Sequence, residues 1–271
     1  MIIQTAPPGT PRLAVMMHEH TALCAQFARA FGNDRFESLS PLDLMIYVIG
    51  HHDAGWTEFD RDPVTDEKTG LPYNLVETPA EHITITSRLS PDFNERQHPY
   101  CGLISSMHSW GLYNGRYGLS NLVLIDRIPQ HDRPLAARML DGELSRQKKL
   151  KEEIGKDSRA SGWLDEKKIF QNYKQLQFLD TLALYFNRVH PDARGDSVRH
   201  RIRTLGREQR GIERRVDLMP QLGDILDAGD PFVAVPCDGL AAEADLDRAV
   251  LEQVEARSRS GSHCTRTPVR R

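Results

Sequence analysis

The sequence predicts a mostly α-helical fold: a bundle of helices followed by a small β or irregular extension at the C-terminus. Two observations carry this prediction. Up to about residue 190, apolar residues recur in most long segments at the spacing of one helix face, and proline and glycine separate the segments. A β-like run, 230–235, comes only after that point, where the texture of the chain changes.

Length and composition set the expected organisation. With 271 residues, 39% of them hydrophobic, the chain is long enough for one large soluble domain or two small ones. We expect a helical domain over 1–190 and an extension over 191–256 packed on the same domain. The last segment, 257–271, has little apolar content and several arginines, which predicts a disordered basic tail.

Charge and cysteine usage exclude several classes of protein. The formal net charge of -3 argues against a nucleic-acid or membrane partner. The arginine-rich stretch 198–216 also contains Glu208 and Glu213, so we expect solvated arginines there. The four cysteines form no C-x-x-C pair, and no basic segment with an apolar core opens the chain. The expectation is a cytoplasmic protein.

The first two helices are expected over 13–31 and 42–53. A partial apolar stripe supports the first, and Gly32 marks its end. Ser40 as N-cap and Pro41 at the first position open the second, which is apolar nearly throughout. Such a helix is a buried one, so it carries His52 and Asp53 into a dry environment.

A long loop is expected over 55–79, where glycine and proline recur. An irregular stretch of this length inside a domain is typical of a lid or binding loop. Thr78 then caps a third helix over 79–89, and a short helix follows over 99–113.

The remaining elements are predicted from the same periodicity. The segment 114–131 is expected to be connecting chain, and 132–153 a charged amphipathic helix. A stronger helical pattern covers 165–189 and carries Asp180 within its apolar stripe, where a carboxylate must be paired or coordinated. A last short helix is expected over 246–255.

The stretch His51-His52-Asp53-Ala54-Gly55-Trp56 organises the candidate site. An adjacent His–Asp pair offers a metal one imidazole nitrogen and two carboxylate oxygens, although the same pair also forms purely structural hydrogen bonds. Its weight comes from other ligand types on predicted helices. In chain order the full set is His20, His52, Asp53, His82, His108 and Asp180.

This order of ligands resembles the HD-domain superfamily of metal-dependent enzymes. The resemblance rests on His20 followed by Cys24-Ala25, on His52-Asp53-Ala54-Gly55, and on Asp180 in the last long helix. The surroundings of His108 and Asp180 are also similar to those in an uncharacterised HD-like bacterial family. The resemblance covers roughly residues 12–190 and implies an HD-domain-like helical bundle.

The resemblance implies a site with two metal ions. His20, His52 and Asp180 would hold the first, His82 and His108 the second, and Asp53 would bridge them. Four imidazoles and two carboxylates suit iron above all, with manganese or zinc as alternatives, better than magnesium or calcium. His52 and Asp53 are the expected catalytic residues.

Two chemistries use such a site in the superfamily. One is oxygenation, as in HD-type diiron oxygenases similar to myo-inositol oxygenase; the other is phosphoester hydrolysis. Hydrolytic members often have lysine where this chain has Trp56, and His108 is followed by Ser109-Trp110-Gly111 instead of the Glu and Gly-Tyr-Pro of the cyclic-dinucleotide branch. We therefore expect an oxygenase that takes dioxygen and a small polar organic substrate. A phosphohydrolase and a non-catalytic metal- or ligand-binding module stay open as alternatives.

Several side chains near the expected ligands are candidates for substrate binding. His18 lies two residues before His20 and would be at the pocket rim or solvated. Trp56 would form either a pocket wall or a plug that fixes the loop on the bundle. The full set is His18, Trp56, Tyr73, Trp110 and Tyr113.

Overall fold

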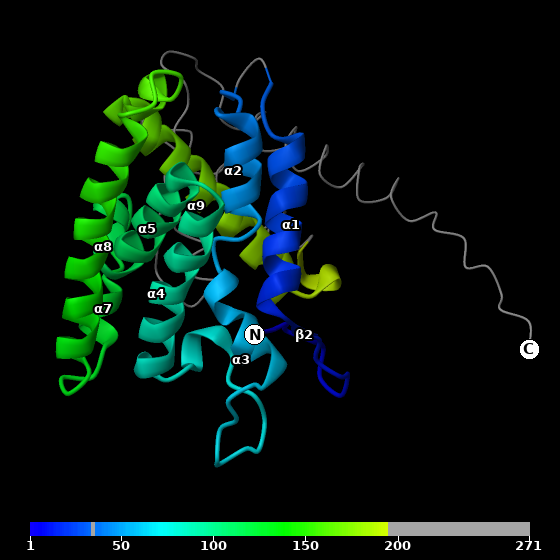
Figure 1. Cartoon of the computed structure of the whole chain (residues 1–271). Coiled ribbons are helices and arrows are strands. Elements are labelled where there is room, and N and C mark those ends of the chain that lie inside the picture. The colour runs from blue at the N-terminus through cyan, green and yellow to red at the C-terminus, as the bar shows by residue number, and fades with distance from the viewer. Residues whose placement is uncertain (34–35, 195–271) are drawn as a thin grey trace, which may run out of the picture. The chain divides into compact units, whose positions relative to one another are not determined.

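The computed structural model of the chain describes residues 1–33 and 36–194, and these residues are mostly helical, as predicted (Figure 1). They belong to one compact unit. The helices in chain order are α1 (Met17–Ala30), α2 (Leu42–Ile49), α3 (Thr57–Arg61), α4 (Ala80–Gln97), α5 (Pro99–Tyr113), α6 (Gly115–Gly118), α7 (Leu124–Arg127), α8 (Arg133–Ile154) and α9 (Glu166–Arg188), with short 3-10 turns η1 (Ala54–Trp56), η2 (Leu75–Glu77) and η3 (Ser161–Leu164).

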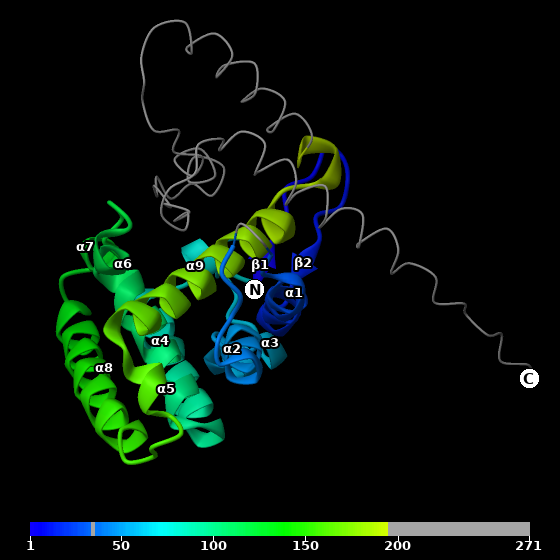
Figure 2. The same ribbon diagram turned by 90° about the horizontal axis from the view of Figure 1, so that it is seen from above.

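Helix α5 lies at the centre of the bundle. Every residue from Tyr100 to Ser109 is buried, as expected for a helix that is covered on all sides. It packs against α2, α4, α8 and α9. Figure 2 shows α1 and α2 on one side and α4, α5 and α8 on the other, with α9 running across both groups.

The N-terminal residues fasten α9 to α1. Strand β1 (Ile2–Ile3) pairs antiparallel with β2 (Ala14–Val15), with Ile2 opposite Val15. The backbone N–H of Thr5 donates to the carbonyl of Arg188 at the end of α9, at 2.7 Å. This small sheet was not expected from the sequence, because two-residue strands leave no periodic pattern.

The second predicted helix is shorter than expected. Helix α2 ends at Ile49, and Gly50 is its C-cap, so His51, His52 and Asp53 form a turn. The expected loop over 55–79 is in turn partly helical, because η1 and α3 cover Ala54–Arg61. The His–Asp pair therefore lies in a break between two helical segments and not on a continuous helix.

Helix α4 is longer than predicted and continues through Pro91 to Gln97. A proline inside a helix removes one backbone donor. Nearby side chains satisfy carbonyls around this position: Ser90 Oγ donates to the carbonyl of Thr86 at 3.0 Å, and Asn94 Nδ2 donates to that of Ser90 at 2.9 Å.

The predicted connecting chain 114–131 contains a left-handed turn. The φ angles of Gly115, Arg116, Tyr117 and Gly118 are 61°, 50°, 57° and 87°. A non-glycine residue in this conformation costs on the order of 1 kcal/mol. The Tyr117 ring packs on Trp110 and Tyr173, with centroid distances of 4.7 and 5.1 Å, and this packing offsets the strain.

Helices α8 and α9 confirm the predictions for 132–153 and 165–189 to within one residue at each end. The expected arginine-rich stretch 198–216, strand 230–235, helix 246–255 and tail 257–271 lie outside the described residues, as does most of the expected extension 191–256. Within the described part of the chain, none of the helices has the length and apolar character needed to cross a membrane.

Candidate metal centre

Five of the six predicted ligands lie together where α1, α5, α9 and the turn after α2 meet. His20 comes from α1, His52 and Asp53 from the turn, His108 from α5 and Asp180 from α9. The three imidazoles are at most 2% exposed and Asp180 is 4% exposed. Polar side chains buried to this degree need partners, so their mutual distances decide what the cluster can do.

His20 is anchored on one side and faces the cluster with the other. Its Nδ1 lies 2.9 Å from Oδ1 of Asn187, an acceptor, so Nδ1 carries the proton and donates it. Its Nε2 lies 3.1 Å from Oδ1 of Asp180. In the neutral ring this places a nitrogen lone pair next to a carboxylate oxygen.

His52 has the same arrangement with a backbone anchor. Its Nδ1 donates to the carbonyl of Ile49, at 2.8 Å, because the turn after α2 brings the ring back onto the last turn of that helix. Its Nε2 is buried and has no hydrogen-bond partner among the described residues. The same atom lies 3.4 Å from Oδ2 of Asp53 and 3.6 Å from Oδ1 of Asp180.

His108 completes the group of imidazoles. Its ring centroid lies 4.9 Å from that of His52, edge to face. Its Nδ1 contacts the amide end of Gln177 on α9, and Oε1 of that amide is buried with no hydrogen-bond partner in the described part of the chain. If the Gln177 amide is turned by 180°, its Oε1 accepts a hydrogen bond from Nδ1–H of His108. Nε2 of His108 then keeps its lone pair for a metal ion.

The electrostatics of the cluster favour a bound cation. Burial works against ionisation of Asp180, yet the neighbouring His20 and His52 hold its pKa well below the usual value. Burial opposes ionisation of Asp53 in the same way, and the charge of His52 holds its pKa below the usual value. Burial and the neighbouring His52 lower the pKa of His108 to about 4. Burial lowers the pKa of His52, but Asp53 and Asp180 together raise it well above the usual value. Two ionised carboxylates thus favour a positive charge in the cluster, beside His108, which stays neutral.

The donor set fits a transition metal. The possible ligand atoms form two groups, and within each group all atoms lie within 4.8 Å of one another. One group is His20, Cys24 and His52, and the other is His52, Asp53 and His108. Ligating histidines characteristically donate their second ring nitrogen to a carbonyl or carboxylate, as His52 does here. The chain therefore contains buried groups that can hold a metal ion.

Cys24 is the member of this cluster that the sequence analysis did not assign. It lies on α1 four residues after His20, on the same face of the helix, and is fully buried. The i, i+4 spacing was the available signal.

His82, the sixth predicted ligand, lies outside both groups of ligand atoms. In the first turn of α4 its Nε2 lies 3.4 Å from Oε1 of Glu81, and its ring packs edge-on against Phe59 with a centroid distance of 5.2 Å. The side chain is 24% exposed. His108, its expected partner on the second metal, groups with His52 and Asp53 instead.

The candidate substrate-binding residues are dispersed. His18 is largely exposed, and its Nδ1 lies 3.2 Å from Oδ2 of Asp60. Trp56 is buried in a hydrophobic cluster with Ile2, Val15 and Met17, as expected for a plug.

The remaining three candidates lie on the loop and around α5. Tyr113 is fully buried, and its hydroxyl lies 3.3 Å from Oγ of Ser87. Trp110 packs on the left-handed turn through Tyr117. The backbone N–H of Tyr73 donates to the carbonyl of Val64 within the loop. None of the contacts described for these residues reaches the metal cluster, so their role in substrate binding stays a prediction.

Comparison with known proteins places the chain in a family. No curated protein matches the chain, and no solved structure does. A family model described as a protein of unknown function, DUF3891, matches residues 1–219, which is more than half of the 271 residues. The chain therefore belongs to the DUF3891 family.

Proposed function

We propose that this protein is a metal-dependent oxygenase of the HD-domain kind, which acts on a small polar organic substrate. One observation carries the proposal. His20 and His52 are each anchored through Nδ1 and both present Nε2 to the same oxygen of Asp180, at 3.1 and 3.6 Å. Two lone pairs and a carboxylate oxygen that face one another repel unless a proton or a cation lies among them.

The residues present suit iron, with manganese or zinc as alternatives. Imidazole and carboxylate together match these metals better than the all-oxygen shells of magnesium and calcium. His20, His52 and Asp180 would hold one ion, and Asp53 with His108 would hold a second or complete the first. When bound, an iron centre of this kind supplies the activation of dioxygen.

The protein's own contribution is exclusion of water and control of protons. His20 and His52 have no exposed side-chain surface, whereas the side chain of Asp53 is 17% exposed. A substrate would therefore approach from the side of Asp53. With a pKa of about 4, His108 is neutral at physiological pH, so it has a nitrogen lone pair for a metal ion.

The residue after the His-Asp-Ala-Gly run weakens the phosphohydrolase alternative, although the resemblance to myo-inositol oxygenase, which also has lysine there, is weakened too. Trp56 stands where hydrolytic members often carry lysine, and its indole is packed among apolar side chains. It therefore offers no charge to a phosphate. This favours an uncharged polar substrate and, with it, the oxygenase.

One observation favours the second candidate, a phosphohydrolase. Arg116 lies close enough to the cluster to act on it electrostatically. Burial is the main cause of the low pKa of His108, followed by His52, and Arg116 adds to it. A guanidinium near the ligands could bind a phosphate.

The test starts from protein purified without oxygen and loaded with ferrous iron. We expect iron to bind to the parent, an absorption change on admission of dioxygen, and dioxygen uptake that rises with one member of a panel of small polyols and amino alcohols. The variant His52→Ala should bind little iron. His51→Ala is the matched control, because the neighbouring His51 donates to the carbonyl of Tyr47 and stacks on its ring, away from the cluster.

Two outcomes would contradict the proposal. Turnover of bis(p-nitrophenyl) phosphate that needs the metal and not dioxygen would assign the protein to the phosphohydrolases. A chain that binds no metal under any loading condition would be a module without a metal-dependent activity.

A further inference from the structure

We infer that Cys24 is a metal ligand, so that the ion held by His20, His52 and Asp180 also carries a sulfur atom. This inference deepens the proposed function and rests on the metal centre proposed there. It changes the donor set of that ion from nitrogen and oxygen alone to two nitrogens, one oxygen and one sulfur.

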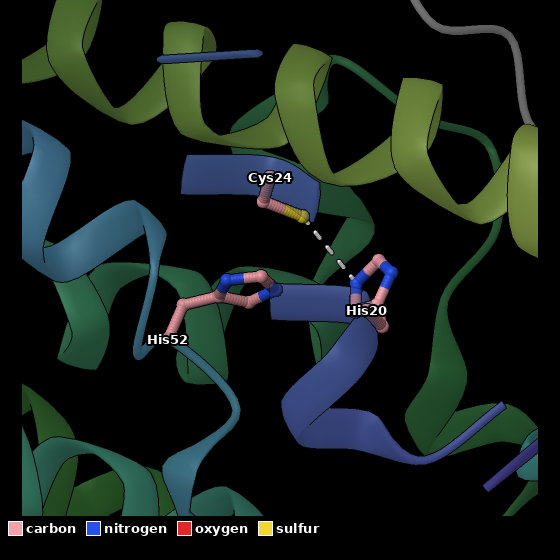
Figure 3. Close-up of side chains that lie close together, drawn as sticks. All are labelled: His20, Cys24 and His52. Carbon is pink, nitrogen blue, oxygen red and sulfur yellow. Dashed lines mark hydrogen bonds between the residues drawn. The ribbon is translucent and has the colours of Figure 1, made fainter. Parts of the chain in front are cut away.

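The position of Cys24 on α1 directs its sulfur at the cluster. Cys24 follows His20 by four residues, which places both side chains on one face of the helix. Its Sγ lies 3.7 Å from Nε2 of His20, and both atoms lie within 4.8 Å of a ring nitrogen of His52. Figure 3 shows the His52 ring pointing toward the space between Cys24 and His20.

The distances match the edges of a tetrahedral site. Metal–ligand bonds of about 2.1 Å to nitrogen or oxygen and about 2.3 Å to sulfur imply separations of about 3.4 Å between two light ligands and about 3.6 Å between nitrogen and sulfur. The measured separations are 3.1 Å from His20 to Asp180, 3.6 Å from His52 to Asp180 and 3.7 Å from His20 to Cys24. Three of the six separations are thus close to those of a tetrahedral site, and His20, Cys24 and His52 form one group of ligand atoms within 4.8 Å of one another.

A second, independent observation points to a missing partner. Nε2 of His52 is buried and has no hydrogen-bond partner among the described residues, although its Nδ1 is fully satisfied by the backbone. An unpaired buried nitrogen is costly. A cation held jointly with Cys24 would remove that cost.

Cys101 shows what a purely structural cysteine looks like in this fold. It is also fully buried, and its thiol donates to the backbone carbonyl of Leu44 at 3.5 Å. The described polar contact of Cys24 is instead the imidazole nitrogen of His20, itself a candidate ligand. The two cysteines are equally buried and differ in what the sulfur faces.

A thiolate ligand would balance the charge of the ion and favour softer metals. A divalent ion bound by two neutral imidazoles and the Asp180 carboxylate keeps one positive charge, and a thiolate neutralises it. Neutral sites are favoured where water is excluded. A thiolate also selects softer ions such as zinc, ferrous iron and cobalt over manganese and magnesium.

Cobalt(II) is the probe that tests this inference. The full-length protein, stripped of metal and kept without oxygen, is titrated with cobalt and its absorption spectrum recorded. We expect visible d–d bands together with a near-ultraviolet thiolate-to-cobalt charge-transfer band. In Cys24→Ser the charge-transfer band should be lost and cobalt affinity should fall at least about tenfold, since even outer partners of ligands affect affinity by about 10–100-fold.

Matched variants separate Cys24 from the other cysteines. Cys101→Ala and the double variant Cys237→Ser/Cys264→Ser should keep the charge-transfer band. Circular dichroism checks that each variant is folded. As a readout that needs no substitution at Cys24, X-ray absorption of the zinc-loaded Cys101→Ala/Cys237→Ser/Cys264→Ser protein should give one sulfur neighbour at about 2.3 Å.

The outcomes separate this inference from the proposed function. Cobalt d–d bands without a charge-transfer band, a band that persists in Cys24→Ser, or a zinc shell without sulfur would overturn the role of Cys24 and leave the metal centre standing. A chain that binds neither cobalt nor zinc would overturn both.

Discussion

Each imidazole of the centre has its own anchor on the side away from the cluster. His20 donates to Asn187, His52 donates to the carbonyl of Ile49, and His108 contacts Gln177. Such outer partners fix which ring nitrogen carries the proton and so which one can bind a metal. The carbonyl of Ile49 can only accept, whereas the amides of Asn187 and Gln177 can each accept from or donate to their histidine.

Gln177 is therefore the residue whose replacement tests the anchoring of His108. We expect Gln177→Met, which keeps the volume and removes the acceptor, to weaken metal binding by about 10–100-fold. Affinity is measured by competition with a chromophoric chelator. Gln175→Met is the control, since Gln175 lies two residues away on α9 and points to another side of the helix. It is also buried, and it donates to the carbonyl of Glu37. Equal losses in both variants would show that only packing is affected.

Single residues show where sequence reasoning succeeded and where it stopped. His20 was correctly expected to face the core, because the apolar residues Leu23 and Phe27 follow it at helical spacing. His82 was expected in the cluster and lies beside Glu81 instead. His82 lies in the first turn of α4, so no apolar residues of the same helix precede it. The apolar pattern therefore did not define the direction of its side chain.

At the scale of elements, the turn that carries His52 and Asp53 is fixed by a close contact with α4. The backbone N–H of Gly55 donates to Oγ of Ser90 at 3.0 Å. A Cβ atom at Gly55 would lie 2.2 Å from the carbonyl oxygen of Thr86 and 2.8 Å from the nitrogen of Ser90. Both are backbone atoms, so the two elements would have to separate.

Alanine at this position should therefore disturb both stability and the site. We expect Gly55→Ala to lower the free energy of unfolding by about 1–3 kcal/mol and to reduce the bound metal, because η1 and Asp53 shift together. Gly142→Ala is the matched control: this glycine lies inside α8 with nothing within 4 Å of its would-be Cβ. There we expect a gain of roughly 0.5–1 kcal/mol from helix propensity. Urea denaturation and metal analysis distinguish the two, and a Gly55→Ala protein as stable as the parent would contradict the close contact.

A second contact between elements, α4 against α8, is charged. Arg146 on α8 is paired with Asp92 and Glu95 on α4, and its Nε lies 3.1 Å from Oε2 of Glu143. Glu143 is 2% exposed, and burial raises its pKa to about 7 although Arg146 opposes the shift. One guanidinium is thus shared among three carboxylates, and ionisation is least favourable for Glu143, the most buried of them.

The pKa of Glu143 predicts a pH dependence of stability. Between about pH 4.3, where an unfolded glutamate titrates, and pH 7, the folded chain retains a proton that the unfolded chain releases. This contribution to stability is therefore present at the lower pH and lost as the pH rises to 7. We expect Glu143→Gln to become more stable relative to the parent as the pH rises from 5 to 8, by on the order of 3 kcal/mol at most.

Urea denaturation at several pH values measures this difference. Glu152→Gln, an exposed position on α8, supplies the control and should give a difference that is small at every pH. A difference between Glu143→Gln and the parent that stays constant over the whole range would show that Glu143 is ionised throughout.

The two longest helices were predictable from the sequence, whereas α4 was predicted too short and the short elements were missed. Helices α8 and α9 match their predicted ranges because a sustained apolar stripe defines them. The predicted helix 42–53 was too long, since His51, His52 and Asp53 continue no apolar pattern that would reveal the turn after Ile49. Three- to five-residue elements such as η1 and α3 contain too few residues to show a period.

At the scale of the whole molecule, the centre joins segments from both ends of the described chain. His20 and Asp180 are 160 residues apart, and His52 and His108 come from two further elements between them. The order of ligand types resembles the HD-domain superfamily, and this resemblance predicted that the six side chains converge; five of them lie together, and His82 lies outside both groups of ligand atoms. The distances within the cluster, and the place of Cys24 beside it, depend on how α1 packs on α9 and could not be obtained from spacing alone.

Because the ligands come from α1, α5, α9 and the turn after α2, a bound ion should stabilise the fold as a unit. An ion present at 100 times its dissociation constant adds about 2.7 kcal/mol to the free energy of unfolding. For a domain of this size the matching rise in Tm is roughly 5–10 °C. We expect a strong chelator to lower the Tm of the metal-loaded protein by this amount in a single transition, since no one helix holds the site.

Asp180→Asn removes a charged ligand from the first ion, and its Tm should barely respond to chelator. Calorimetry with metal analysis of the same samples measures both. If chelation removes the metal and the parent's Tm stays unchanged, the ion sits at the surface and not among the buried histidines.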